Sequence, residues 1–343
     1  MSVIKFKPKQ ASKKLLSALS DRSKDIIQSR YGLGESNERM TLEAIGQLYG
    51  ITRERVRQIE NHSIAVIRKS KQYSDEKVIF DELEQLIQSL GGIIVEQDLL
   101  DHISKDSSIQ NQINFILVIG HPFKKIKEDD DFKHRWYVNE GISERVHGSL
   151  KKVYENLKDE DLVPETEMIK AFMDHVKDMA DKFKDEEMIR RWLSISKKIG
   201  KNPLGEWGKT SSPNISTKGM RDYAFLVIRK HGSPIHFKEV AKIIGEVFKK
   251  KAHIATCHNE LIKDPRFVLV GRGLYALSEW GYMSGVVKDV IKKILTKHGP
   301  LTKEDIIEKV MKERYVKENT IAVNLQNPKY FKKDKEGKYT VAK

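Results

Sequence analysis

Four side chains near residue 55 are of the types that recognise the edges of DNA bases. Arg53 and Arg57 are one helical turn apart, and so are Glu54 and Gln58, so all four can line one side of a helix. Arginine can donate two hydrogen bonds to guanine, glutamine can bond adenine, and glutamate can accept from cytosine. The spacing indicates base reading, although Glu–Arg pairing on a solvated helix would account for the same residues.

The elements that must position these side chains are predicted by residues 41–69. Thr41 is a suitable N-cap for a short amphipathic helix, Gly50 ends that helix, and Thr52 caps a second one. This order is typical of a helix-turn-helix whose second helix enters the major groove. We expect contacts to the DNA backbone from helix N-termini and basic side chains of the segment, namely Thr41, Thr52, Arg55, Arg68 and Lys69.

Residues 12–72 resemble region four of bacterial RNA polymerase sigma factors of the sigma-70 family. The strings that carry the resemblance are LSDRSKDIIQSRYGL and TLEAIGQLYGITRERVRQIE. The resemblance implies that the four base-reading residues contact a promoter −35 element, and that an apolar surface of the domain could hold the polymerase flap. A complete sigma factor has a promoter-melting domain before region four, whereas about a dozen residues precede it here. We therefore expect a regulator and not an initiation factor acting alone.

The remainder of the chain shows weak internal repetition. VIRKHGSPIHFKEVAKII at 227–244 parallels IKKILTKHGPLTKEDIIEKV at 291–310, and each continues into a third helical stretch and a short hairpin. Helix, helix, helix and hairpin is the order of a winged helix. Residues 218–280 also resemble the HARE-type winged helix of the polymerase delta subunit and of chromatin- and restriction-associated proteins, through HGSPIHFKEVAKII and LIKDPRFVLVGRGLYALSEW.

These patterns predict a mainly α fold, with an N-terminal helix-turn-helix domain followed by an array of winged-helix domains. The predicted segments are a basic arm at 1–11, a sigma region 4-like domain at 12–74, an acidic winged-helix-like domain at 75–140, a diverged copy at 141–207, a linker at 208–217, a HARE-type domain at 218–280 and a C-terminal winged-helix-like domain at 281–343.

Charge is distributed unevenly over the 343 residues, whose net charge is +14. Residues 1–74 carry 15 Lys/Arg against 7 Asp/Glu, whereas residues 75–140 carry 7 against 14. The basic ends favour a polyanionic partner, and the acidic middle disfavours one continuous DNA-wrapping surface. We expect residues 128–131, Glu-Asp-Asp-Asp, to be a solvated turn. Lysines of the C-terminal hairpin could contact phosphate or simply aid solubility: Lys332, Lys333, Lys335 and Lys338.

Several classes of function are disfavoured by the sequence. The single cysteine, Cys257, excludes a disulfide framework, and with His253 and His258 it is expected to be a core residue beside surface histidines and not a metal site. There is no Walker loop, GxGxxG motif, signal segment or long apolar run. We expect no enzyme activity, cofactor, metal, small-molecule substrate or membrane contact, and a cytoplasmic, nucleoid-associated protein.

Two hypotheses for function follow. The first is a DNA-binding transcription regulator that reads duplex DNA through residues 53–58 and contacts RNA polymerase. The second is an interaction protein, similar to the delta subunit, that binds polymerase or chromatin and contacts DNA only secondarily.

Overall fold

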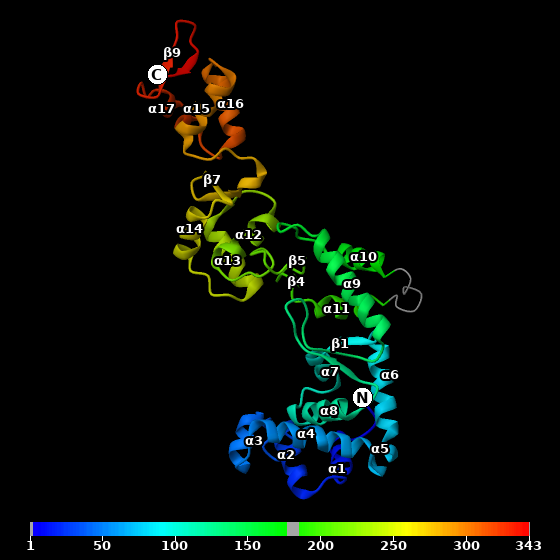
Figure 1. Ribbon diagram of the computed structural model, residues 1–343. Helices are drawn as coiled ribbons and strands as arrows, with labels where there is room; N and C mark the ends of the chain where they lie inside the picture. Colours follow the sequence, from blue (N-terminus) through cyan, green and yellow to red (C-terminus); the bar gives the residue numbers. More distant parts are fainter. Residues whose placement is uncertain (1–2, 177–184, 343) are drawn as a thin grey trace. The chain divides into compact units, whose positions relative to one another are not determined.

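The computed structural model describes residues 3–176 and 185–342, which form helices and small antiparallel sheets (Figure 1). The chain divides into two compact units: unit 1 comprises 1–200 and 207–210, and unit 2 comprises 201–206 and 211–343. The predicted fold class, mainly α with helix-turn-helix and winged-helix domains, is confirmed.

Unit 1 begins with the helices that contain the predicted helix-turn-helix. They are α1 (Pro8–Leu16), α2 (Asp21–Tyr31), α3 (Leu42–Tyr49), α4 (Arg53–Arg68) and the short α5 (Lys71–Asp75). The predicted basic arm differs from what is observed: α1 begins within it, Ile4 is buried, and the amide of Lys5 donates to Glu82. The N-terminal segment from Ile4 is therefore packed on unit 1.

A first winged helix follows in unit 1. Its elements are α6 (Lys77–Ser89), β1 (Ile93–Val95), α7 (Glu96–Ile103), α8 (Ser107–Ile119), β2 (Lys124–Ile126) and β3 (Arg135–Tyr137), with the antiparallel strand order β1-β3-β2. The second copy has α9 (Glu140–Asn156), α10 (Glu165–His175), α11 (Glu186–Ile195), and strands β4 (Ile199–Lys201) and β5 (Trp207–Lys209).

Unit 2 contains two further copies of the same order. The first has α12 (Met220–His231), β6 (Ile235–His236), α13 (Phe237–Phe248), α14 (Ile254–Lys263), β7 (Phe267–Gly271), β8 (Leu274–Leu277) and a 3-10 turn, η2 (Ser278–Trp280). The second has α15 (Val287–His298), α16 (Lys303–Glu313), α17 (Glu318–Leu325), β9 (Phe331–Lys333) and β10 (Tyr339–Val341).

One pairing recurs in all four copies. An aromatic residue in the last strand pairs with an apolar residue that precedes the second helix, which ties the hairpin to the helices. The pairs are Ile94–Trp136, Val163–Trp207, Ile235–Tyr275 and Leu301–Tyr339. The repeat seen weakly in the sequence is thus a structural repeat.

Shared hydrophobic cores join the modules of unit 1. Leu15, Ile27 and Ile67 of the N-terminal helices lie in one buried cluster with Phe115 and Ile116 of α8. A second buried cluster joins Ile93 of β1 to residues of α9, α10 and α11. The boundaries near residues 74 and 140 therefore separate repeats in the sequence, while the packing across each of them is continuous.

The segment predicted as a linker, 208–217, is ordered. Residues 207–209 form β5, and Ile215 is buried. The side chain of Asn214 accepts a hydrogen bond from Arg266 at 3.2 Å.

Among the described helices, none has the length and apolar character needed to cross a membrane.

Candidate nucleic-acid interface

The turn between α3 and α4 is fixed by residues that the sequence had singled out. The Thr41 hydroxyl accepts from the Ala44 amide at 3.1 Å, and the Thr52 hydroxyl accepts from the Arg55 amide at 3.2 Å. Gly50 ends α3 with φ +65°, in the left-handed region that favours glycine. At Gly46 a Cβ atom would lie 2.6 Å from the Ile51 carbonyl oxygen, so the turn can pass close to the helix only if this residue is glycine.

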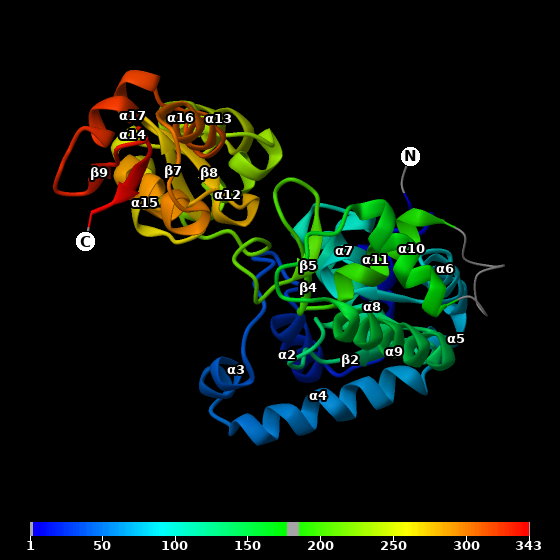
Figure 2. The same cartoon turned by 90° about the horizontal axis from the view of Figure 1, so that it is seen from above.

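The first two turns of α4 present the predicted base-reading side chains to solvent. Val56 is fully buried with Ile26 and Ile45, which fixes the rotation of α4 about its axis. Arg53, Glu54, Arg57 and Gln58 are all exposed. Figure 2 shows α4 as a long helix along the edge of unit 1, with α3 beside its N-terminal end.

Two of these side chains are already paired with each other. The Arg57 guanidinium donates to both carboxylate oxygens of Glu54, at 2.7 and 2.9 Å. This hydrogen bonding holds the pKa of Glu54 below its ordinary value and raises the pKa of Arg57. Both side chains are more than half exposed, so the pair is weak enough to exchange for base edges. Pairing of Glu54 with Arg57 in the free protein is therefore compatible with base reading by the same side chains in a complex.

Arg55 lies on a different edge of α4 from Arg53 and Arg57. Its guanidinium donates to the Gln58 amide oxygen at 3.1 Å. It lines a groove of about 620 Å³ between α4 and the start of α2. The groove is also lined by residues that the sequence reasoning did not select, namely Ser20, Arg22, Ser23 and His62. The sequence signal for the first three is only that polar and basic side chains begin α2, whereas His62 lies on α4.

The predicted backbone-contacting residues differ in their surroundings. Thr41 and Thr52 use an oxygen lone pair as helix caps, which leaves the hydroxyl proton able to donate to a phosphate. Lys69 is exposed at the C-terminal end of α4. Because the helix rises about 1.5 Å per residue, Lys69 lies about 24 Å along the axis from Arg53.

Arg68 has a structural role in place of the one assigned from sequence. Its Nε donates to the Ile119 carbonyl at 2.8 Å, and its Nη2 donates to the Val118 carbonyl at 2.9 Å. These carbonyls belong to the last turn of α8, where no helical amide follows to satisfy them. Arg68 therefore caps α8, and its guanidinium is not a candidate phosphate contact.

Helix α8 also covers much of the apolar surface of the helix-turn-helix domain. Eight of the thirteen residues of α8 are buried, and Tyr31 of α2 meets Phe115 edge to face with ring centroids 5.4 Å apart. Asn111 donates to the carbonyls of Gly32 and Asn37 at 3.0 and 2.8 Å. The loop before α3 is thus anchored to the first winged helix.

The acidic turn at 128–131 is not simply solvated. Asp129 accepts from the buried Arg135 at 3.0 Å, Glu128 pairs with Lys197 at 2.7 Å, and Asp131 pairs with Lys198 at 2.5 Å. The turn differs from the predicted solvated one because it lies against the second winged helix, whose Lys197 and Lys198 neutralise part of its charge.

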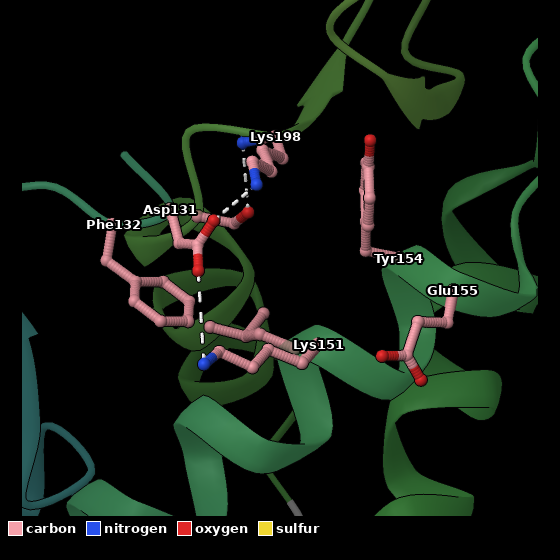
Figure 3. A pocket seen from close by; sticks show the side chains of 8 residues that line it. Asp131, Phe132, Lys151, Tyr154, Glu155 and Lys198 are labelled. Atoms are coloured by element: carbon pink, nitrogen blue, oxygen red, sulfur yellow. Dashed lines mark hydrogen bonds and ion pairs between the residues drawn. The ribbon is translucent and has the colours of Figure 1, made fainter. Parts of the chain in front are cut away.

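A pocket of about 260 Å³ lies beside this turn. Figure 3 shows Asp131 between Lys151 and Lys198, with Tyr154 across the opening. Lys198 and Lys209 also lie over the Tyr154 ring, at 5.6 and 5.0 Å from its centroid. Asp131, Lys151 and Lys198 thus form a small ion-pair network that joins the first winged helix to the second.

Cys257 differs from its neighbours His253 and His258 in burial. Cys257 is fully buried, and burial raises the pKa of its thiol to about 11. His253 is exposed, whereas His258 stacks on Phe237 with ring centroids 4.1 Å apart.

The geometry of α3, the Gly50 turn and α4 defines a helix-turn-helix domain. Residues 15–69 match the family model of Sigma-70, region 4, and this segment is a sigma-70 region 4 helix-turn-helix. The match covers the cap residues, the turn and all four predicted base-reading residues.

Curated relatives share this part of the chain. The RNA polymerase sigma factor SigA1 of Synechococcus elongatus is 48% identical over 54 residues, 16% of this chain and 13% of that protein. The sigma factor SigA of Listeria monocytogenes is 39% identical over 70 residues, 20% of this chain and 18% of that protein. SigA of Nostoc sp. is 46% identical over 55 residues, 16% of this chain and 14% of that protein. The chain thus spans less than a fifth of the length of each of these relatives.

Proposed function

We propose that this protein is a DNA-binding transcription regulator in which the N-terminal half of α4 reads duplex DNA of −35 type. The observation that carries the proposal is that Val56 is buried on one side of α4 while four polar side chains in the first two turns of the helix are exposed. Burial fixes which side of the helix faces outward, and that side carries Arg53, Glu54, Arg57 and Gln58. The likeness of residues 15–69 to RNA polymerase sigma factors supports it.

Selection of bound sequences from a random duplex pool tests this proposal. We expect enrichment of one short motif, with an affinity that falls steeply as salt concentration rises, because phosphate contacts release counterions. Recovery of the pool without enrichment would contradict base reading by α4.

We also propose contact with RNA polymerase, to which the names of the relatives point. Because α8 covers much of the apolar surface of this domain, a contact with the polymerase flap has to use what remains exposed. Among the described residues of 15–69, Leu48 of α3 is the large apolar side chain that is strongly exposed, at 64%.

Leu48→Ser tests the polymerase contact without disturbing the core. We expect it to reduce capture of purified core polymerase by the full chain, whereas Gln47→Ala, at the neighbouring position, leaves capture unchanged. Equal capture by both variants would remove Leu48 from the contact. Deleting residues 1–74 is less informative, because it would expose the core that those residues share with α8.

A second candidate function, a protein-interaction role for an array of winged helices, is favoured by one feature of unit 2. The third helix of its first copy, α14, exposes Ile254 at 48% and Ile262 at 61%, and Leu269 of β7 is exposed at 46%. An apolar exposed helix suits a protein partner better than DNA phosphates. The HARE-type resemblance of 218–280 belongs to this proposal. Ile262→Ser in the full chain should weaken the capture of core polymerase while duplex binding stays unchanged. Loss of duplex binding in this variant would contradict a protein-interaction role for α14.

A further inference from the structure

The third helix of each winged helix is the equivalent of a recognition helix, and in unit 1 both are occupied by protein contacts. Helix α8 lies against the sigma region 4 domain, with most of its residues buried. Helix α11 packs on β1, where the Trp192 indole donates to the Gly91 carbonyl at 3.1 Å. Helix α8 therefore cannot enter a DNA groove without breaking these contacts, and the buried side of α11 is held against β1.

The C-terminal winged helix of unit 2 differs in this respect. Its third helix, α17, leaves Asn319, Thr320 and Val323 exposed. This copy, residues 281–343, also carries 15 Lys/Arg against 8 Asp/Glu. It is drawn in orange to red in Figure 1.

Two lysines of this copy lie over the ring of Tyr330, and two more are close to Tyr330 in the sequence. The ammonium nitrogens of Lys288 and Lys292, one turn apart on α15, lie 4.7 and 4.6 Å from the centroid of the Tyr330 ring. Lys329 precedes the tyrosine, and Lys332 is exposed on β9. Contact with the ring orders the first two side chains before any ligand arrives, which lowers the entropic cost of binding.

These four lysines lack carboxylate partners among the described residues, unlike several of their neighbours. Lys312 is paired with Glu308 at 2.7 Å, and Lys338 is paired with Glu336 at 3.1 Å. A cluster of like charges that the fold leaves uncompensated stabilises the binding of an anion, because no existing ion pair has to be broken.

We propose that Lys288 and Lys292, which lie over the Tyr330 ring, bind the phosphate backbone of duplex DNA together with Lys329 and Lys332, which are close to Tyr330 in the sequence. Lysine is a point charge that contacts phosphate without reading sequence. Single-stranded nucleic acid fits less well, because lysines lie over the aromatic ring on which a base would have to stack. This surface would be a second DNA-binding site that is independent of sequence. It does not depend on base reading by α4.

The test is the triple variant Lys288→Gln, Lys292→Gln, Lys332→Gln in the full chain. A matched control removes three exposed lysines of unit 1 with the same loss of charge: Lys127→Gln, Lys152→Gln, Lys170→Gln. Binding to a duplex of arbitrary sequence is measured by fluorescence anisotropy over a series of salt concentrations. Each lost phosphate contact lowers the slope of log affinity against log salt by about 0.9, so we expect the test variant to lower it by about 2 to 3. A slope equal to that of the control overturns the proposal.

Two further measurements separate this proposal from a folding defect and from the function proposed for α4. Lys288→Arg with Lys292→Arg keeps the charge and the ring contacts, so wild-type binding is expected, and a loss equal to that of the glutamine variant contradicts a charge-based contact. In a background of Arg53→Ala with Arg57→Ala, the residual duplex binding should still fall when the C-terminal lysines are changed. Tighter binding to single-stranded RNA of the same length than to the duplex would also overturn the assignment.

Discussion

The guanidinium of Arg68 caps the last turn of α8, with its Nε 2.8 Å from the carbonyl oxygen of Ile119. The end of the recognition helix is thereby fixed to the third helix of the next module, which also packs on α1 and α2. The sigma region 4 domain is therefore held by its neighbour at the end of α4 opposite to Arg53.

Arg68→Ala is expected to destabilise unit 1 and to leave DNA binding largely intact. It removes two charge-assisted hydrogen bonds from half-buried carbonyls, a loss of about 1–3 kcal/mol in the free energy of unfolding. Denaturant unfolding measures it. Lys69→Ala is the matched control, since Lys69 is exposed and should affect duplex affinity, equally for all sequences, but not stability. A stability loss in Lys69→Ala equal to that in Arg68→Ala would contradict the capping role.

Gly91→Ala is expected to disrupt the junction of the two winged helices of unit 1. Gly91 has φ +114°, and an added Cβ atom would lie 2.6 Å from Nε1 of Trp192. Backbone strain and the clash together should destabilise the protein by at least about 2 kcal/mol. Gly148→Ala in α9 meets no atom within 4 Å and should stabilise by about 0.5–1 kcal/mol. Thermal unfolding of both variants would show shifts of opposite sign, and a neutral Gly91→Ala would refute the close packing.

The stability of unit 1 should fall as pH decreases, because His147 must stay neutral in the folded state. Its Nε2 accepts from Arg135 at 2.8 Å, and burial, with the nearby Arg135 charge, lowers its pKa from 6.5 to about 4. The unfolded chain therefore binds the proton more tightly, so the stabilisation is present above pH 6.5 and is lost as pH falls towards 4.

The neutral isostere His147→Gln tests this pH dependence. Since His147 is only partly buried, we expect a loss of about 1–2 kcal/mol between pH 6.5 and 4 in the wild type that the variant does not show. Unfolding curves across this range measure the difference. Identical pH profiles for the two proteins would mean that folding does not lower the pKa of His147.

The local geometry of the helix-turn-helix could be predicted from the sequence, whereas its contacts with the first winged helix could not. Thr41, Gly50 and Thr52 act on backbone groups within four residues of themselves, so their types alone indicate the caps and the turn. Arg68 could not be assigned in this way, because a basic residue at a helix end looks the same whether it meets a phosphate or a carbonyl. Its partner lies 51 residues away.

The same limit applies to the acidic turn at 128–131 and to the domain boundaries. A run of carboxylates is usually solvated, and the lysines that pair with this one come from the following repeat. Likewise, the apolar residues of α1, α2 and α8 each predict an amphipathic helix, but periodicity does not say which helices share a core. Which of these helices pack together is seen only in the structure.

Freeing Arg57 from Glu54 should change specificity more than affinity. Glu54→Gln removes the carboxylate that holds the guanidinium at 2.7 and 2.9 Å and also removes a negative charge from the DNA-facing side. We expect tighter binding to arbitrary duplexes and a smaller ratio between preferred and arbitrary sequences. Competition binding measures that ratio, and an unchanged ratio would show that the pair takes no part in discrimination.

The most direct test of base reading by α4 compares the sequences selected from a random duplex pool by the wild type, Arg57→Ala and Lys69→Ala. The structure predicts one motif for the wild type and the same motif, at lower affinity, for Lys69→Ala. For Arg57→Ala it predicts a motif that becomes degenerate at one or two positions, with a loss of about 1–3 kcal/mol in discrimination there. An unchanged motif for Arg57→Ala would contradict the claim that the exposed side of α4 reads DNA.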